Sequence, residues 1–129
     1  MSPYLLDTCA LLWWMSDAPD LGTKARRIIG DRRHHLVVST ASLWEIAIKL
    51  RKGRLTGVDE YLARYAELHD RWGFATLVIE PPDGVAAGAL MIPHEDPFDR
   101  MLIVQARRIG ARIVTCDEAI RAGYRDCVW

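Results

Sequence analysis

Five acidic side chains have the residue type and spacing that a catalytic or metal-binding site would need: Asp7, Glu45, Asp96, Asp99 and Asp117. If four of them converge, neighbouring carboxylates about 5 Å apart repel by about 3 kcal/mol per pair at an effective dielectric near 20. Such a pocket takes up protons or holds a cation. Carboxylates without imidazole or thiolate ligands select Mg²⁺ or Mn²⁺ before Zn²⁺. These ions activate water, so the expected chemistry is phosphoryl transfer to water.

Some of these acids also have a purely structural interpretation. Asp7 and Asp117 each precede a possible helix and are suited to cap it. Glu45 lies nearly opposite the apolar stripe of its helix, which by itself indicates a solvated side chain. Trp44 and Ile48, however, suggest that this helix has a second packed side. Function and capping therefore both stay open at these positions.

The stretch HEDPFDRML, residues 94–102, predicts a helix start. Asp96 suits the N-cap, Pro97 the first helical position, and Asp99 the first turn, where a carboxylate complements the helix dipole. Asp99 fits a capping box less well, because that position prefers Glu or Gln. Asp96 is thus explained by capping, and Asp99 is not.

Short apolar runs that do not alternate with polar residues are typical of strands buried on both faces. The runs are Pro3 to Asp7, His35 to Thr40, Ala111 to Asp117, and Phe74 to Pro82, the last closed by its prolines. The C-terminal DCVW predicts a short edge strand. Because ligands bind beyond the carboxyl ends of parallel strands, we expect Asp7 and Asp117 to emerge at one edge of the sheet.

Helical patterns separate these runs and cover residues 7–16, 20–33, 40–53, 58–73 and 96–110, with the second ending near Gly30. The fourth places Leu62, Tyr65, Ala66 and His69 on one side. The fifth is apolar nearly all round, as expected of a helix buried under a sheet. Alternating strands and helices predict an α/β sandwich around a mainly parallel sheet, and 129 residues suit a single domain over 1–129.

Composition narrows the function classes. Seventeen basic residues balance seventeen acidic ones, so any nucleic-acid contact must depend on a local patch. The three cysteines have no C-x-x-C spacing, which favours a reduced, cytoplasmic protein. The N-terminus lacks the basic start and long apolar run of a signal peptide, and no run approaches the roughly 20 apolar residues of a membrane span. We expect a soluble protein without a membrane partner.

Four blocks, LLDTCALLWW, STASLWEIAIK, HEDPFDRMLIVQA and IVTCD, match a known family in order and spacing. They resemble the PIN-domain ribonucleases, in particular the VapC toxins of bacterial VapBC toxin-antitoxin pairs, from Tyr4 to Asp117. The resemblance implies a three-layer α/β/α sandwich with a mainly parallel sheet of four to five strands. It also implies a magnesium-dependent endoribonuclease, with Mn²⁺ as an alternative ion.

Carried over by position, the family's catalytic and metal-binding acids fall on Asp7, Glu45, Asp99 and Asp117. Asp96 becomes a supporting residue, and Thr8 and Thr115 match hydroxyls that orient carboxylates or a metal-bound water. In the implied mechanism, water activated by the ion attacks the phosphorus in line while the metal neutralises the developing charge. No covalent nucleophile is required, and we find no Ser-His-Asp or Cys-His arrangement in the sequence.

Other candidates are weaker. Arg100 could meet a phosphate or pair with a carboxylate of the site. The densest basic stretch, KLRKGRL, offers Lys49, Arg51, Lys52 and Arg54 for RNA contact, although charged helix ends are usually solvated and Lys49 also lies four residues after Glu45. Trp13 and Trp14 fit the core or an interface better than base stacking. The four histidines show no metal-ligand spacing and are interpreted as structural or exposed, His94 included.

The resemblance also implies partners. A small antitoxin is expected to lay its C-terminal segment across the acidic site, often inserting an arginine among the carboxylates. A homodimer and larger toxin-antitoxin assemblies are expected, and the RNA that is cut stays open, because specificity depends on surface shape around a generic site.

Two alternatives are not nucleases. A receiver-like signalling domain needs an acidic pair after the first strand and a late lysine, whereas this chain has one aspartate and Asp117. A catalytically silent PIN-like module that only binds RNA or protein usually lacks one or more of the four acids. All four positions are acidic here, which favours activity.

Overall fold

The structure is a computed structural model that describes residues 2–129. Its strands are β1 (Tyr4–Leu6), β2 (Leu36–Ser39), β3 (Phe74–Leu77), β4 (Arg112–Val114) and β5 (Cys127–Val128). They form one five-stranded sheet in the order β3-β2-β1-β4-β5, and every pair is parallel. Tyr4 of the central strand aligns with Leu36 on one side and Arg112 on the other. The predicted parallel sheet, including its short C-terminal edge strand, is confirmed.

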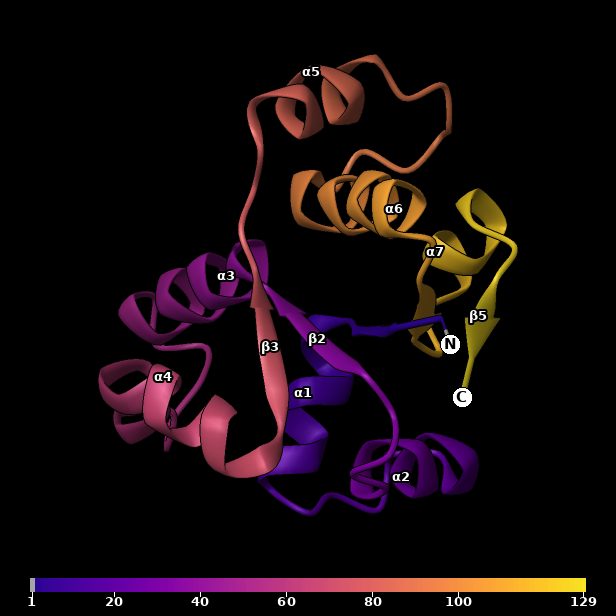
Figure 1. Cartoon of the computed structure of the whole chain (residues 1–129). Coiled ribbons are helices and arrows are strands. Elements are labelled where there is room, and N and C mark those ends of the chain that lie inside the picture. Colours follow the sequence, from indigo (N-terminus) through magenta and orange to yellow (C-terminus); the bar gives the residue numbers. More distant parts are fainter. Residues whose placement is uncertain (1) are drawn as a thin grey trace.

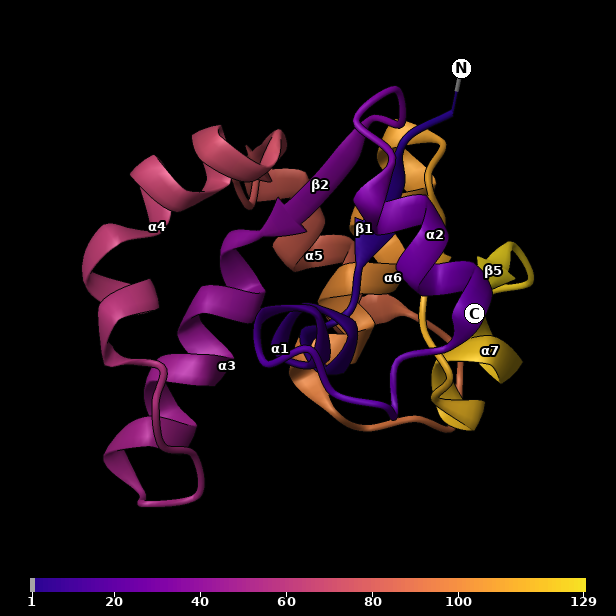
Figure 2. The ribbon, with the colours of Figure 1, turned by 90° about the horizontal axis from the view of Figure 1, so that it is seen from below.

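Helices cover both faces of this sheet. They are α1 (Thr8–Met15), α2 (Thr23–Gly30), α3 (Thr40–Arg51), α4 (Asp59–Trp72), α5 (Pro81–Ala89), α6 (Pro97–Ile109) and α7 (Glu118–Gly123). In Figure 1, α5, α6 and α7 lie on one side of the sheet and α1, α2 and α4 on the other. Figure 2 shows α1 and α2 in front of the central strands when the molecule is turned. This is the expected three-layer α/β/α sandwich.

Two apolar cores lie on opposite faces because successive strand side chains alternate in direction. Leu5 of β1 points toward α6 and α7, where it joins Ile103 and Ile120 in one buried cluster. Leu6 points the other way, into a cluster built with α1, α2, α3 and α4 that includes Leu11. Burial on both faces explains why the strand sequences do not alternate with polar residues.

The third strand differs from the prediction. We expected a strand over residues 74–82, but β3 ends at Leu77 and Pro81 begins α5. Proline suits the first position of a helix, where its missing N–H is not needed. Glu80 and Asp83 form a reciprocal capping box, in which the Glu80 N–H donates to Asp83 Oδ2 over 2.8 Å. The prolines therefore start a helix, which the sequence pattern did not predict because the helix contains two glycines.

The buried face of α4 also differs from the prediction. Tyr61, Leu68 and His69 are buried, whereas Tyr65 of the expected face is 42 % exposed. The backbone at Arg64 leaves helical geometry (φ −127°, ψ 24°) and kinks the helix. A kink rotates the second half of the helix relative to the first, so a single helical wheel cannot describe both halves.

Two further findings concern the whole described chain. No helix within residues 2–129 is both long enough and apolar enough to cross a bilayer. Cys9, Cys116 and Cys127 are all free thiols.

Candidate active site

The four predicted acids lie at one edge of the sheet, where the parallel strands end. Asp7 follows β1 directly, and its N–H donates to the Val114 carbonyl of β4 over 3.1 Å. Asp117 follows β4 by three residues, and Glu45 lies in the second turn of α3, which begins where β2 ends. Asp99 lies in the first turn of α6. Parallel pairing of β1, β2 and β4 thus gathers residues that are far apart in the sequence.

Asp7 is buried, at 4 % exposure, and both of its oxygens accept hydrogen bonds. The Ala10 N–H donates to Oδ1 over 2.7 Å, which makes Asp7 the N-cap of α1. The Thr115 hydroxyl donates to Oδ2 over 2.5 Å. Burial raises the pKa of Asp7 to about 6, and the charges of Asp99 and Asp117 add to this effect, while the two hydrogen bonds oppose it. Asp7 is therefore both a helix cap and a member of the acidic site.

Glu45 is buried, at 8 % exposure, so the interpretation that it is a solvated side chain is wrong. The Thr8 hydroxyl donates to Glu45 Oε1 over 2.6 Å, and Thr8 Oγ1 also lies 3.0 Å from the hydroxyl oxygen of Ser42. The ammonium of Lys49 lies 2.9 Å from Oε2. The second packed side of α3 forms because α1 and the start of α6 cover it, with Trp44 in edge contact with Phe98.

Asp96 and Asp99 have different roles at the start of α6. Asp96 Oδ1 accepts the N–H groups of Phe98 (2.9 Å) and Asp99 (3.1 Å), which confirms it as the N-cap. Asp99 is turned toward the strand ends, and its Oδ2 lies 2.7 Å from Nε2 of His94.

His94, interpreted from the sequence as structural or exposed, lies beside the acids, and its role in metal binding is a proposal that the sequence pattern did not suggest. Ring nitrogen and carboxylate oxygens of His94, Asp99 and Asp117 all lie within 4.8 Å of one another. His94 had no recognisable ligand spacing, since it lies in a loop before α6. The sequence feature that could have identified His94 is its position at the start of the HEDPFDRML stretch, five residues before Asp99.

Asp117 combines capping with a free oxygen. Its Oδ1 accepts the N–H groups of Ala119 (2.8 Å) and Ile120 (3.1 Å), so it caps α7. The Asp117 N–H donates to Thr115 Oγ1 over 3.0 Å, so Thr115 links Asp7 and Asp117 through one hydroxyl. Within residues 2–129, no hydrogen-bond donor reaches Asp117 Oδ2 or Asp99 Oδ1. These two oxygens are available to a cation.

Electrostatics agree with a shared site. The pKa of Asp99 is raised to about 6, mainly by burial and also by the charges of Asp96, Asp117 and Glu45. The hydrogen bond from His94 opposes this rise. The charge of Asp117 thus raises the pKa of both Asp7 and Asp99. Buried like charges either bind protons or hold a cation that offsets the repulsion. The donor set fits a divalent ion bound by oxygens and one imidazole nitrogen.

Arg100 binds backbone carbonyls, and its possible contact with a phosphate stays a prediction. Its guanidinium donates to backbone carbonyls of the segment between α5 and α6, with the shortest bonds to Leu90 (2.6 Å) and His94 (2.9 Å). It also donates to Ala87 over 3.0 Å. In the part of the chain that the structure describes, no carboxylate pairs with Arg100. Arg100 therefore fixes the loop that carries His94.

The four basic residues predicted to contact RNA lie in two different environments. Lys49 is committed to Glu45, whereas Arg51, Lys52 and Arg54 are exposed at the end of α3 and the turn that follows. Trp13 and Trp14 are partly buried against the core, and Trp13 contacts the Trp129 ring edge-on at 5.7 Å. This agrees with their interpretation as core or interface residues.

The comparisons with known proteins agree with this geometry. The family model of the PIN domain matches residues 4–125. The chain is 29 % identical over 125 residues to Ribonuclease VapC22 of Mycobacterium tuberculosis, covering 95 % of this chain and 92 % of that protein.

Two solved structures share the fold. VapBC2 from Rickettsia felis, bound to a DNA fragment from their promoter, aligns with a TM-score of 0.63 at 14 % identity, over 88 % of this chain and 87 % of that one. PAE2754 from Pyrobaculum aerophilum aligns with a TM-score of 0.57 at 20 % identity, over 98 % and 82 %. The resemblance to VapC-type PIN domains inferred from the sequence is confirmed, and the chain belongs to the PIN domain family.

Proposed function

We propose that this protein is a divalent-metal-dependent endoribonuclease that acts as the toxin of a toxin-antitoxin pair. The observation that carries the proposal is the cluster of His94, Asp99 and Asp117, whose ligand atoms lie within 4.8 Å of one another at the carboxyl edge of the sheet near Asp7 and Glu45. Among residues 2–129, no hydrogen-bond donor reaches Asp117 Oδ2 or Asp99 Oδ1. The similarity to a protein named Ribonuclease VapC22 supports the same reaction.

A bound cation would be held by Asp99, Asp117 and His94, with the Asp7 carboxylate near them, and Nε2 of His94 would exchange its hydrogen bond to Asp99 for the metal. Mg²⁺ or Mn²⁺ would supply Lewis-acid stabilisation of the charge that develops on the phosphate. Mg²⁺ prefers oxygen ligands, and imidazole is better tolerated by later transition metals. The place of His94 therefore favours Mn²⁺ more than an all-carboxylate site would.

The chain's own residues hold these donors in place. Thr115 fixes Asp7 from one side, Thr8 and Lys49 fix Glu45, and His94 fixes Asp99. A carboxylate whose rotamer is locked by such bonds loses little freedom when it binds.

The experiment is cleavage of an end-labelled RNA by purified wild type and Asp99→Asn, with Mg²⁺, Mn²⁺ or EDTA. We expect cleavage by the wild type only when metal is present, loss of at least about 100-fold in Asp99→Asn, and relief of growth arrest by the same change. Asp20→Asn removes an exposed carboxylate and is the matched control. Cleavage by Asp99→Asn at the wild-type rate would refute the proposal, and RNA binding without cleavage would favour the catalytically silent module.

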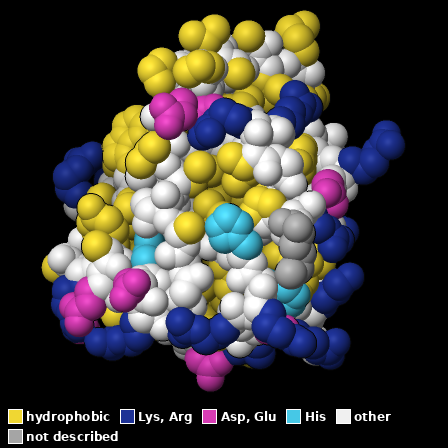
Figure 3. Space-filling model, in the orientation of Figure 1, with side chains coloured by type: hydrophobic (Ala, Val, Ile, Leu, Met, Phe, Trp, Pro, Cys, Tyr) yellow, Lys and Arg dark blue, Asp and Glu magenta, His cyan; other side chains and the backbone are white. Residues whose placement is uncertain are grey.

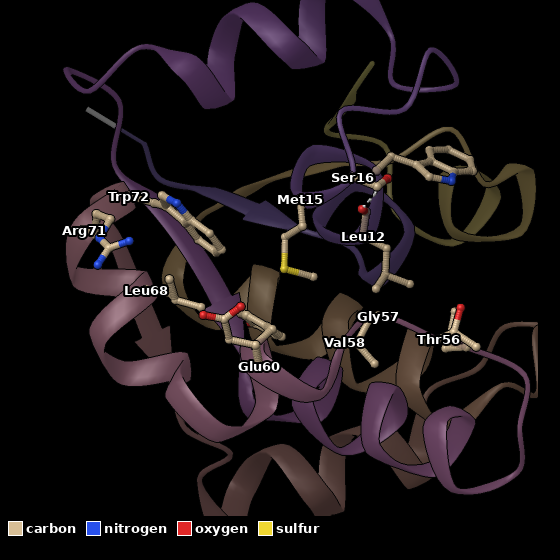
Figure 4. A pocket seen from close by; sticks show the side chains of 13 residues that line it. Leu12, Met15, Ser16, Thr56, Gly57, Val58, Glu60, Leu68, Arg71 and Trp72 are labelled. Carbon is tan, nitrogen blue, oxygen red and sulfur yellow. Dashed lines mark hydrogen bonds between the residues drawn. The ribbon is translucent and has the colours of Figure 1, made fainter.

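A cognate antitoxin is the proposed physiological partner, as in the VapBC2 assembly to which the fold is similar. A hollow of about 530 Å³ lies between α1, the segment 55–58 and α4. Figure 4 shows Leu12, Met15, Leu68 and Trp72 around it. We propose that apolar side chains of the antitoxin fill this hollow while its C-terminal segment reaches the acids. Met15→Glu should then abolish antitoxin binding and leave RNA cleavage intact, as measured by calorimetry and gel assay.

Self-association is proposed at a second apolar surface. Val78, Ile79, Val85 and Met91 are exposed on α5 and its flanks, with Met91 at 95 %. Figure 3 shows hydrophobic side chains gathered at the top of the molecule, where Figure 1 places α5. Exposed apolar patches of this kind mark protein interfaces. Val85→Glu should convert a dimer to a monomer in light-scattering measurements.

A further inference from the structure

Three arginines converge on a hollow that the acidic site does not use. The hollow has a volume of about 540 Å³ and lies where the end of α6, α7 and β5 meet. Arg107, Arg121 and Arg125 line it together with Ala122, Gly123 and Cys127. All three arginines are exposed, and none of the six lining residues is aromatic.

The charge of this hollow is not neutralised by the protein. Among residues 2–129, no carboxylate oxygen lies within 4.0 Å of the guanidinium of Arg107, Arg121 or Arg125. The neighbouring acid, Asp126, is bound by Arg112 over 3.0 Å. Arg108, next to Arg107, is bound by Asp83 over 2.8 Å. The free arginines thus make a positive patch on a chain whose formal net charge is zero.

Helix dipoles explain only part of this arrangement. Basic side chains are favoured in the last turn of a helix, which accounts for Arg107 in α6 and Arg121 in α7 taken singly. It does not account for their meeting around one hollow with Arg125, which lies outside any helix. Convergent, unpaired guanidinium groups are instead suited to phosphate oxygens, which they bind in a bidentate manner.

The hollow lies toward the opposite end of α6 from the acids, because Arg107 follows Asp99 by eight residues, about 12 Å along the helix axis. Asp117 caps α7 and Arg121 follows one helical turn later, about 5.4 Å along the axis. An RNA strand that crosses the acids must therefore extend about 12 Å along α6 and α7 to reach the arginines.

We propose that the hollow formed by Arg107, Arg121 and Arg125 binds the phosphate backbone of the RNA substrate at a distance from the scissile bond, where the strand leaves the acids along α6 and α7. The inference rests on the proposed ribonuclease function and adds a second contact region to it. Because the hollow offers guanidinium groups and no aromatic ring, it binds sugar-phosphate and does not read bases. It would raise affinity for RNA in general and leave the choice of cleavage site to other surfaces.

The test measures binding separately from cleavage. Anisotropy of a labelled single-stranded RNA is recorded with Asp99→Asn protein, which is expected not to cut, from about 50 to about 200 mM KCl. Replacing Arg107, Arg121 and Arg125 together by Gln should weaken binding by on the order of 10- to 100-fold and lower the salt slope by about 2, since each lost phosphate contact removes about 0.7. Replacing the same three by Lys should keep most of the slope.

The matched control is the triple change Lys24→Gln, Arg27→Gln and Arg33→Gln, which removes the same charge from exposed side chains of α2 and the turn after it. Equal losses in both triples would show a general charge effect and overturn the proposal. Unchanged RNA affinity and slope in the arginine triple, with wild-type cleavage intact, would overturn it while the ribonuclease function stands. Loss of antitoxin binding without loss of RNA binding would assign the hollow to protein instead. If the wild type fails to cleave but RNA affinity still depends on these arginines, the hollow is confirmed and the ribonuclease proposal fails.

Discussion

Thr115→Val tests how the protein sets the charge of the acidic site. The Thr115 hydroxyl donates to Asp7 Oδ2 over 2.5 Å and accepts the Asp117 N–H over 3.0 Å, and the residue is fully buried. Valine has nearly the same shape but can make neither bond. The change therefore removes a hydrogen bond to an ionised carboxylate, worth about 1.5 to 3 kcal/mol, without opening a cavity.

The magnitude follows from the pKa of Asp7, which burial raises to about 6. The lost bond stabilises only the ionised form of Asp7, so its loss raises the pKa further, by about 1 to 2 units at 1.36 kcal/mol per unit. A carboxyl that is mostly ionised at pH 7.5 in the wild type would then be about one quarter to three quarters protonated at that pH. Because a cation needs the ionised form, the pH midpoint of metal binding should rise by about one unit.

The assay is calorimetric titration with Mn²⁺ from about pH 5.5 to about pH 9, a range that brackets both expected midpoints. Thr115→Ser keeps the hydroxyl and is the matched control, with a midpoint at the wild-type value. If valine, serine and wild type share one midpoint, Thr115 does not control the ionisation of Asp7 and the assignment of this pair is refuted.

Three further outcomes are expected. Asp99→Asn mimics the neutral carboxyl. The pKa of Asp99 is about 6 in the folded protein and about 3.9 in the unfolded chain. The stability that protonated Asp99 contributes is therefore complete below about pH 4 and is lost as the pH rises through about 6. In EDTA, urea denaturation should therefore find the variant more stable than wild type by up to about 3 kcal/mol at pH 7.5, with no difference near pH 4. Arg100→Lys cannot reach the carbonyls of Leu90 and His94 together, so it should lower stability by about 1 to 3 kcal/mol and speed hydrogen exchange of the segment between α5 and α6. Gly22→Ala would place a Cβ 2.7 Å from the Trp129 ring, so it should displace that ring and shift tryptophan fluorescence, and an unchanged spectrum would contradict this expectation.

Much of the site could be predicted because parallel topology determines it. Once β1 and β4 were recognised as buried parallel strands, Asp7 and Asp117 had to emerge at the same edge. The start of α6 follows local rules, since Asp96 and Pro97 specify the N-cap and first position.

The remaining features of the site depend on tertiary contacts, which cannot be predicted from the spacing of apolar residues along the sequence. A helical wheel places Glu45 on the surface, whereas in the structure it is buried and accepts a hydrogen bond from Thr8 of the neighbouring helix α1. His94 reaches Asp99 because Arg100 holds the preceding loop by its carbonyls, which no local pattern specifies. Helix α5 was missed because its glycines and prolines resemble a turn, although Glu80 and Asp83 cap it.

The central claim is that these acids hold the divalent ion with which the protein cuts RNA. Its most direct test is a Mn²⁺ titration in which bound metal, followed by electron paramagnetic resonance, and RNA cleavage are measured on the same samples. We predict that cleavage rises over the same Mn²⁺ concentrations as binding, and that Asp99→Asn with Asp117→Asn loses both while Asp20→Asn keeps both. Cleavage without bound metal, or metal binding that survives the double change, would contradict the account.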